Sequence, residues 1–141
     1  MPSPMANSIR KILLLGNGLT FLLIAVYVFF AADKAAYLYG YTLNGVDGLN
    51  EFRAVYMGFW IGLTILFFTA AWKIEFALLG DLALTMVLMQ SLGRLLSFIK
   101  DGRPSTRFIF VFFLEIVTSL AGLLVRPQTS PIKQKQEQDR S

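Results

Sequence analysis

The 141-residue chain contains no cysteine and no histidine. Without cysteine it forms no disulfide and offers no thiol nucleophile, and without histidine it has no Ser-His or Cys-His catalytic pair. The two absences also remove zinc sites with nitrogen or sulfur ligands and haem held by histidine or cysteine. We therefore expect no metal and no cofactor, and most membrane redox chemistry is disfavoured.

Charge is scarce too, because only 16% of the residues are charged whereas 55% are hydrophobic. This composition is too apolar for an ordinary soluble domain and predicts a membrane protein. The formal net charge of +4 comes mainly from the chain ends and connecting loops. It favours a signal for membrane orientation over a nucleic-acid-binding surface, so the expected partner is the lipid bilayer and no nucleic acid is expected.

Long apolar segments predict an all-α, integral membrane four-helix bundle. The expected spans cover residues 10–32, 51–72, 74–99 and 106–125, within one transmembrane domain, residues 1–126. The first span also resembles a secretory signal peptide, but its uncharged run of 21 residues from Ile12 to Ala32 exceeds the ~7–15 residues of a signal-peptide core. We favour a retained helix. The polar remainder, residues 127–141, is predicted to be disordered.

Residues 33–49 are predicted to form a loop at the membrane interface, with a short edge strand as the alternative. Three tyrosines alternate along this loop: Tyr37, Tyr39 and Tyr41. Tyrosine suits the interface because its ring is apolar while its hydroxyl stays wet. Asn50 is predicted to cap the second helix, which places Arg53 in the first turn. A cation there meets the positive end of the helix dipole, so a nearby acid or anionic ligand would explain it.

Small residues recur every fourth position on the second predicted helix, at Ala54, Gly58 and Gly62. Such a stripe lets another helix approach closely. Two interpretations remain open: contact within the bundle of one chain, which we favour, and a face for a homodimer or another membrane protein.

The third predicted helix carries polar side chains on one face, because Gln90, Arg94, Ser97 and Asp101 follow i, i+4, i+7 and i+11 spacing. In a bilayer this face should point inward. The turn that follows contains a proline, which prevents the helix from continuing, and Ser105 is predicted to cap the last helix.

Glu115 is the lone carboxylate of the last predicted span. Arg94 lies five residues before Ile99 and Glu115 seven residues after Phe108, so both sit ~8–10 Å below the same membrane surface. Burying an arginine at mid-bilayer costs about 2.5–3.5 kcal/mol. Because a short turn joins the two helices, we predict an Arg94–Glu115 ion pair, with Arg53 entering from the same surface.

Two interpretations stay open for the predicted polar cluster, whose seven members are Asn50, Arg53, Gln90, Arg94, Asp101, Ser105 and Glu115. In the first, Arg53, Arg94, Asp101 and Glu115 form a buried clamp that fixes helix register, and the protein is an accessory or interaction subunit of a membrane complex. In the second, the cluster lines a pocket for a small anionic molecule or a lipid head group, with two guanidinium groups as forked donors and Gln90 as a neutral contact. Proton-coupled transport through Glu115 has weaker support.

An enzyme is disfavoured, because no close pair of carboxylates occupies one helix face and no glycine-rich phosphate loop is present. The predicted topology places both termini on one side of the membrane. That side carries seven Lys and Arg residues and the opposite loops carry four, when Arg53 and Arg94 are counted as intramembrane. The positive-inside rule then predicts cytoplasmic termini.

Four features together resemble a family of small bacterial four-helix membrane proteins whose domain has no known function. They are Asn50-x-x-Arg53, Gly93-Arg94, Asp101-Gly102-x-Pro104-Ser105 and Glu115. The resemblance covers about residues 9–125. It implies a multi-pass protein of the bacterial inner membrane and implies no substrate or reaction.

Overall fold

The computed structural model describes residues 4–126, and every regular element in this range is a helix. In chain order the elements are α1 (Pro4–Leu38), α2 (Gly45–Arg53), the π-helix η1 (Ala54–Phe59), α3 (Trp60–Trp72), α4 (Ala77–Asp101) and α5 (Thr106–Leu124). The all-α prediction is confirmed, and the tyrosine-containing segment forms no edge strand. The segment predicted to be disordered, residues 127–141, lies outside the described range.

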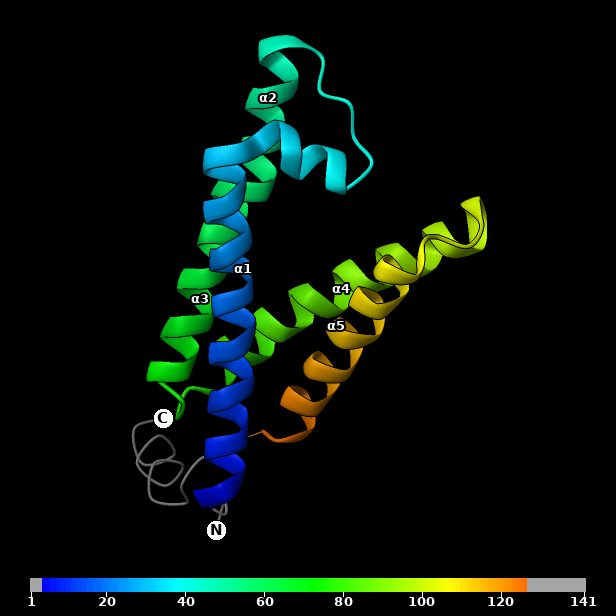
Figure 1. The fold of residues 1–141 in the computed structure, drawn as a ribbon. Coiled ribbons are helices and arrows are strands. Elements are labelled where there is room, and N and C mark those ends of the chain that lie inside the picture. Colours follow the sequence, from blue (N-terminus) through cyan, green and yellow to red (C-terminus); the bar gives the residue numbers. More distant parts are fainter. Residues whose placement is uncertain (1–3, 127–141) are drawn as a thin grey trace, which may run out of the picture.

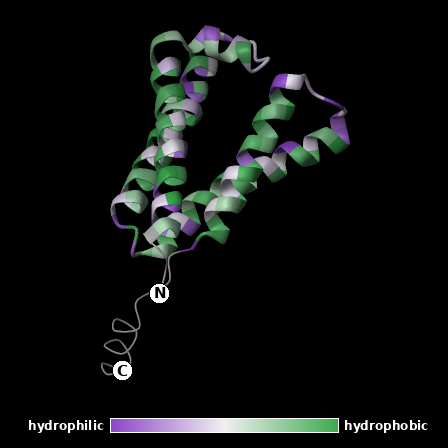
Figure 2. Ribbon diagram, turned by 60° about the horizontal axis from the view of Figure 1, so that its bottom comes forward, coloured by the Kyte–Doolittle hydropathy of each residue, from purple (hydrophilic) through white to green (hydrophobic). Residues whose placement is uncertain are grey.

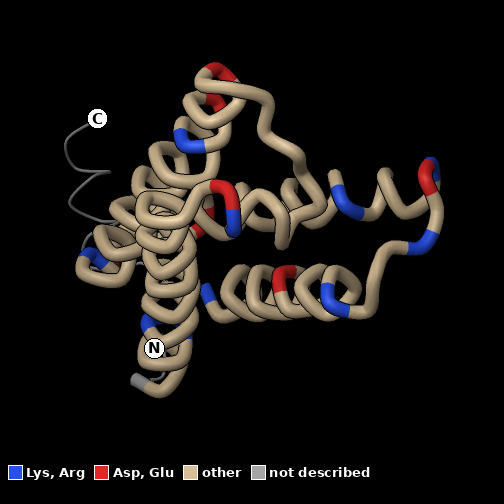
Figure 3. Tube along the Cα trace, turned by 45° about the horizontal axis from the view of Figure 1, so that its top comes forward, with Lys and Arg blue, Asp and Glu red and all other residues tan. Residues whose placement is uncertain are grey.

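Within residues 4–126, four helical stretches are long and apolar enough to span a membrane: Met5–Leu38, Gly45–Trp72, Ala77–Asp101 and Thr106–Leu124. Large apolar side chains are exposed along them, and hydrophobic residues dominate the helices in Figure 2. Most charged residues lie toward helix ends and turns (Figure 3). Such surfaces suit lipid rather than water, so the chain is a multi-pass membrane protein.

The spans form two antiparallel pairs that meet at one end and diverge toward the other (Figure 1). α1 packs along α3, and α4 packs along α5. At the joined end, which we call the vertex, Arg10 of α1 is hydrogen-bonded to the carbonyl of Gly122 in α5. The beginning of α1 and the end of α5 therefore lie together, and the two pairs diverge toward the opposite end, where a hydrogen bond from Arg107 to the carbonyl of Leu38 still links α5 to the end of α1.

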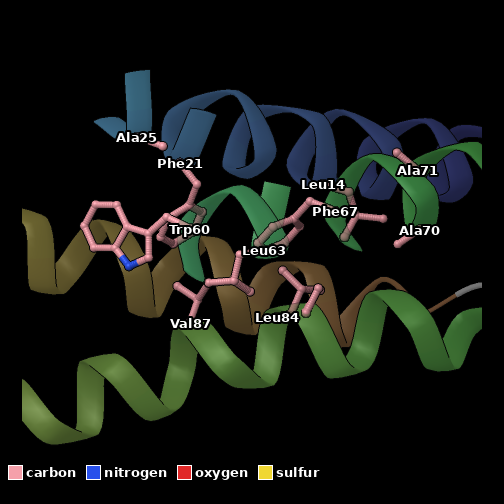
Figure 4. Close-up of a cluster of buried hydrophobic side chains, with 11 residues drawn as sticks. Leu14, Phe21, Ala25, Trp60, Leu63, Phe67, Ala70, Ala71, Leu84 and Val87 are labelled. Carbon is pink, nitrogen blue, oxygen red and sulfur yellow. The ribbon is translucent and has the colours of Figure 1, made fainter. Parts of the chain in front are cut away.

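The larger hydrophobic core lies where α1 and α3 pack against α4 (Figure 4). Leu14 and Phe21 are seven residues apart, which places them on the same face of α1. Phe21 stacks on Phe67 with ring centroids 5.9 Å apart and meets Trp60 edge-on at 5.3 Å. In a bilayer such contacts stabilise the fold through close packing rather than through exclusion of water. The core thus holds the two helix pairs together near the vertex.

α1 changes direction at Ala31, where the backbone φ is −142° and ψ is 52°. Beyond this point the chain stays helical to Leu38 and crosses over toward the second span (Figure 1). Small side chains allow this close crossing, because buried alanines of the last turns pack on Phe52. The prediction of a loop over residues 33–49 is therefore wrong for its first part, where the alanines favour helix.

The second span consists of α2, η1 and α3. It begins at Gly45 with Asn44 at the N-cap position, and Asp47 occupies the first turn, where a carboxylate is favourable. Asn50 consequently lies inside α2, and the prediction that it caps the helix is wrong. Arg53 sits in the last turn of α2, not in the first turn of a helix. η1 follows directly, and π-helical turns of this kind occur frequently at functional sites.

The stripe of small residues faces away from the rest of the chain. Ala54, Gly58 and Gly62 are all exposed, and a Cβ atom added at Gly62 would meet nothing within 4 Å. The close helix contacts occur at other glycines instead, since a Cβ at Gly18 would lie 2.7 Å from the ring of Phe68. The contact within the bundle that we favoured from sequence is thus not formed at these three residues.

Candidate functional site

Glu115 of α5 is the centre of a polar cluster that joins α5 to α4. Arg94 donates two hydrogen bonds to it, from Nε to Oε2 at 3.0 Å and from Nη2 to Oε1 at 3.2 Å. Gln90 Nε2 donates to Oε1 at 3.0 Å, and Ser91 Oγ donates to Oε2 at 3.1 Å. The structure therefore brings Gln90, Arg94 and Glu115 together, and Ser91 is a member that the sequence did not single out.

Some N–H groups of Arg94 remain without a partner after it pairs with Glu115. A guanidinium group has five N–H donors, and Glu115 accepts two of them. The other three have no hydrogen-bond partner among residues 4–126, and the group lies over the ring of Phe108 with Cζ 5.9 Å from the ring centroid. Since the carboxylate balances the charge of the guanidinium, Arg94 and Glu115 together offer polar donors with no net charge.

An elongated cavity of about 430 Å³ lies between α1 and the α4–α5 pair. On α1, lining residues repeat every three or four positions from Ile12 to Ile24. On α5 they do so from Phe108 to Thr118. Twelve residues of helix correspond to a length of ~18 Å. Most of the wall is apolar, and the Arg94–Glu115 pair lines one part of it. A long molecule with one polar end fits this distribution.

A second cavity of about 380 Å³ adjoins the first. Both cavities share five lining residues, which we call the junction: Tyr39, Trp60, Gln90, Arg94 and Phe108. The remaining wall of the second cavity is largely aromatic and includes Tyr56 and Phe59 of η1. Neither the indole N–H of Trp60 nor the hydroxyl of Tyr39 is hydrogen-bonded within the described part of the chain. With Arg94, three side chains at the junction thus retain free donors.

Tyr39 is placed at the junction by the way in which α1 ends. Gly40 has a φ of +80°, and the N–H of Tyr41 donates to the carbonyl of Ala36 at 2.9 Å, as in a Schellman motif. Burial raises the pKa of the Tyr39 hydroxyl, so the group stays protonated and able to donate. Its ring lies 6.2 Å from that of Phe108, which connects the end of α1 to α5.

A second polar cluster, which the sequence did not predict, lies at the vertex. Arg10 is fully buried, and its Nη2 donates to Asp81 Oδ1 at 2.7 Å and to the carbonyl of Ala77 at 2.9 Å. Its Nη1 donates to the carbonyl of Gly122 at 2.8 Å, and Arg126 Nε contacts Asp81 Oδ2 at 2.7 Å. Arg10 is one of the basic residues counted from the sequence on the side of the termini, and its side chain links α1, α4 and α5.

Four of the seven predicted cluster residues lie elsewhere, the first being Asn50, which is exposed on α2 and lines neither cavity. Arg53 is half-buried but makes no ion pair within residues 4–126, and it lines neither cavity. Asp101 is exposed and accepts a hydrogen bond from Ser97 Oγ at 3.0 Å. Ser105 occupies the predicted N-cap position of α5, but its side chain makes no capping hydrogen bond. The helix rotations that separate these residues from Glu115 were not visible in the sequence.

A cluster of acidic side chains suited to a metal ion is not found within residues 4–126. The chemistry available at the junction is therefore hydrogen bonding, aromatic stacking and apolar contact. The cavity and its lining define a multi-pass membrane protein with an internal site that is apolar along its length and polar at the junction.

The chain belongs to the family described as a domain of unknown function (DUF4345), whose model matches residues 9–125. The match confirms the resemblance drawn from the sequence, over the same residues. No curated protein and no solved structure matches the chain. The family description names no activity, so the function has to be argued from the site.

Proposed function

We propose that this protein binds an amphipathic, lipid-like molecule in the cavity between its two helix pairs and has no enzymatic activity. The apolar part of the molecule lies along the α1 residues that line the larger cavity, and its polar end reaches Gln90 and Arg94. A bilayer supplies such molecules laterally, and the cavity is accessible from the surface of the helices. Pockets of about 300–1,000 Å³ are the usual size for small ligands, which both cavities meet.

One observation carries this proposal: free donors of three side chains converge where two cavities join, inside an otherwise apolar site. These donors are not fully buried, so a molecule in the cavities can reach them, whereas the fully buried side-chain atoms without a partner within residues 4–126 are on Asn7, Arg10 and Ser119. The carboxylate of Glu115, by contrast, has its hydrogen-bond partners within the chain, since it accepts four hydrogen bonds. The unused donors of Arg94, Trp60 and Tyr39 leave hydrogen bonds for a ligand to accept.

Filling the cavity tests the proposal. Gly16 lines the larger cavity, and a Cβ atom there would meet nothing within 4 Å, so Gly16→Phe should occupy the site without disturbing the fold. We expect native mass spectrometry of gently extracted protein to show a bound small molecule that is lost in this variant. Gly93→Phe is the control, because Gly93 is exposed, equally open and outside both cavities.

An accessory role in a membrane complex is the second candidate, and the saturated bonding of Glu115 favours it. With four hydrogen bonds from α4, this carboxylate works as a clamp between α4 and α5 whether or not a ligand is present. The open stripe of Ala54, Gly58 and Gly62 would then be the contact for a protein partner or a second copy. A retained protein mass, with no small molecule in the parent, would support this role and refute the first.

The protein is proposed to reside in the bacterial inner membrane with cytoplasmic termini. The family resemblance supports the location, and the distribution of Lys and Arg supports the orientation. Since Arg10 is buried, the termini side retains six basic residues against four in the opposite loops. The junction would then lie toward the non-cytoplasmic side.

A further inference from the structure

We infer that the molecule bound at the junction has an uncharged, oxygen-bearing head group and a single long apolar chain, and that phosphate-bearing lipids are excluded. This inference rests on the proposed function and narrows it. The sequence alone had favoured an anionic ligand, held by two arginines. The structure supplies one arginine there, and its charge is already balanced.

The charge balance at the junction argues against an anion. Arg94 and Glu115 form a bidentate pair, and Arg53 does not line the site. Arg107 lines neither cavity: its Nη2 donates to the carbonyl of Leu38 at 2.6 Å, and its Cζ lies 5.3 Å from the centroid of the Phe108 ring. A phosphate next to Arg94 would also lie close to the Glu115 carboxylate and would be repelled by it. No unpaired cation among the lining residues offsets the cost of burying that charge.

The free groups at the junction instead match an uncharged acceptor. Arg94 and the indole of Trp60 can only donate hydrogen bonds, and the Tyr39 hydroxyl donates while it is protonated. Carbonyl, ester and ether oxygens accept such bonds without adding charge. The aromatic wall formed by Tyr56, Trp60 and Phe108 gives a flat surface for the head group to pack against.

The length of the cavity argues for one chain rather than two. The α1 residues that line the larger cavity, from Ile12 to Ile24, extend ~18 Å along the helix. The volume of this cavity is about 430 Å³. A single extended acyl or isoprenoid chain matches a space of this length and volume. Asn17 and Thr20 along this wall each donate one hydrogen bond within α1, to the carbonyls of Leu13 and Gly16. The wall therefore presents little polar character to the chain.

Tryptophan quenching provides the test, because the chain has two tryptophans in contrasting places. Trp60 lines the junction and is 5% exposed, whereas Trp72 lies far along α3 and is 86% exposed. The Trp72→Phe protein in phosphatidylcholine bilayers reports on the junction, and Trp60→Phe reports on the surrounding lipid. The probes are a monoacylglycerol and the lysophosphatidate with the same dibrominated acyl chain, which differ only in the phosphate.

We expect the monoacylglycerol to quench Trp60 saturably and about tenfold more tightly than the lysophosphatidate does. In a Glu115→Gln background the balance of charge is lost, so this preference should shrink or reverse. Equal or stronger quenching of Trp60 by the lysophosphatidate in the parent would overturn the inference while leaving the proposed function standing. If neither probe quenches Trp60 beyond the level seen at Trp72, the proposed function fails and the inference fails with it.

Discussion

The vertex and the junction each contain an arginine–carboxylate pair between helices, but the two pairs are packed in opposite ways. Arg10 is fully buried, bonds to two backbone carbonyls as well as to Asp81, and leaves no space beside it, since a Cβ at Gly80 would lie 2.6 Å from its Nη2. Arg94 is 21% exposed, bonds only to Glu115, and lines two cavities.

This contrast separates a polar group that holds the fold from one that is available to a ligand. At the vertex, Arg10 uses three of its five N–H donors, its Nε is buried without a partner among residues 4–126, and Gly80 brings the backbone of α4 against the guanidinium group, so no open volume is left. At the junction, the carboxylate is satisfied but the arginine is not. Burial and ion pairing alone therefore do not mark a site, whereas unused donors beside an open volume do. Three experiments test this distinction.

Arg10→Met should have the largest effect. It leaves Asp81 with only the exposed Arg126 and leaves the carbonyls of Ala77 and Gly122 without their donor. Removing one partner of a buried pair typically costs about 3–5 kcal/mol. We expect that loss in the free energy of unfolding, measured in detergent micelles with a chemical denaturant. Lys11→Met, at the neighbouring exposed position, should change it by no more than about 0.5 kcal/mol. Equal stability of the two variants would show that the vertex does not hold the helix pairs.

Gly80→Ala should have a smaller effect at the same place. The added methyl group would overlap Arg10, so either the guanidinium group or α4 has to shift. Overpacking of this kind costs about 1–3 kcal/mol. Gly93→Ala adds the same methyl group to the same helix where nothing lies within 4 Å. It should stabilise the protein by up to about 1 kcal/mol, because alanine favours helix over glycine. A Gly80→Ala protein as stable as Gly93→Ala would mean that the vertex is loosely packed.

The number and type of the spans could be predicted from sequence because long apolar runs leave few alternatives in a bilayer. The start of the second span was misplaced because Asn50 was taken as the cap, while the turn at Gly45 and the favourable Asp47 lay upstream. The helical continuation of α1 was missed because its tyrosines suggested an interface, although the alanines among them favour helix. In both places the local sequence contains residues that favour helix, but Asn50 and the tyrosines led to a different prediction.

The candidate site was predictable only within one pair of helices that are adjacent in the chain. The spacing of Gln90 and Arg94 and the matched depth of Glu115 were sufficient to predict their contact, because a short turn fixes α4 beside α5. Contacts between distant segments were not predictable in this way. Arg10 and Asp81 meet across 71 positions, and Tyr39 reaches the junction only because α1 bends at Ala31. The second span is rotated so that Arg53 and the small residues face away from the junction. The spacing of residues along one helix does not predict this rotation.

The smallest expected effect is the coupling between Arg94 and Glu115, and it bears most directly on how the junction differs from the vertex. Glu115→Gln and Arg94→Gln should each destabilise the protein, because each leaves the other charge partly buried and unpaired. The double variant should recover part of the loss, with a coupling free energy on the order of 1 kcal/mol. Denaturant titrations in micelles give all four values, and Ser97→Ala with Asp101→Asn forms the exposed control cycle.

The same cycle distinguishes a clamp from a binding site when it is repeated with added monoacylglycerol. For a pure clamp, the ligand leaves all four unfolding free energies unchanged. For a binding site, the ligand stabilises the parent and loses that effect with Arg94→Gln, since the free donors disappear even where the fold has recovered. A double variant that regains stability but not ligand response would show that one side chain performs two separable tasks, holding Glu115 with two of its donors and offering the others to the cavity.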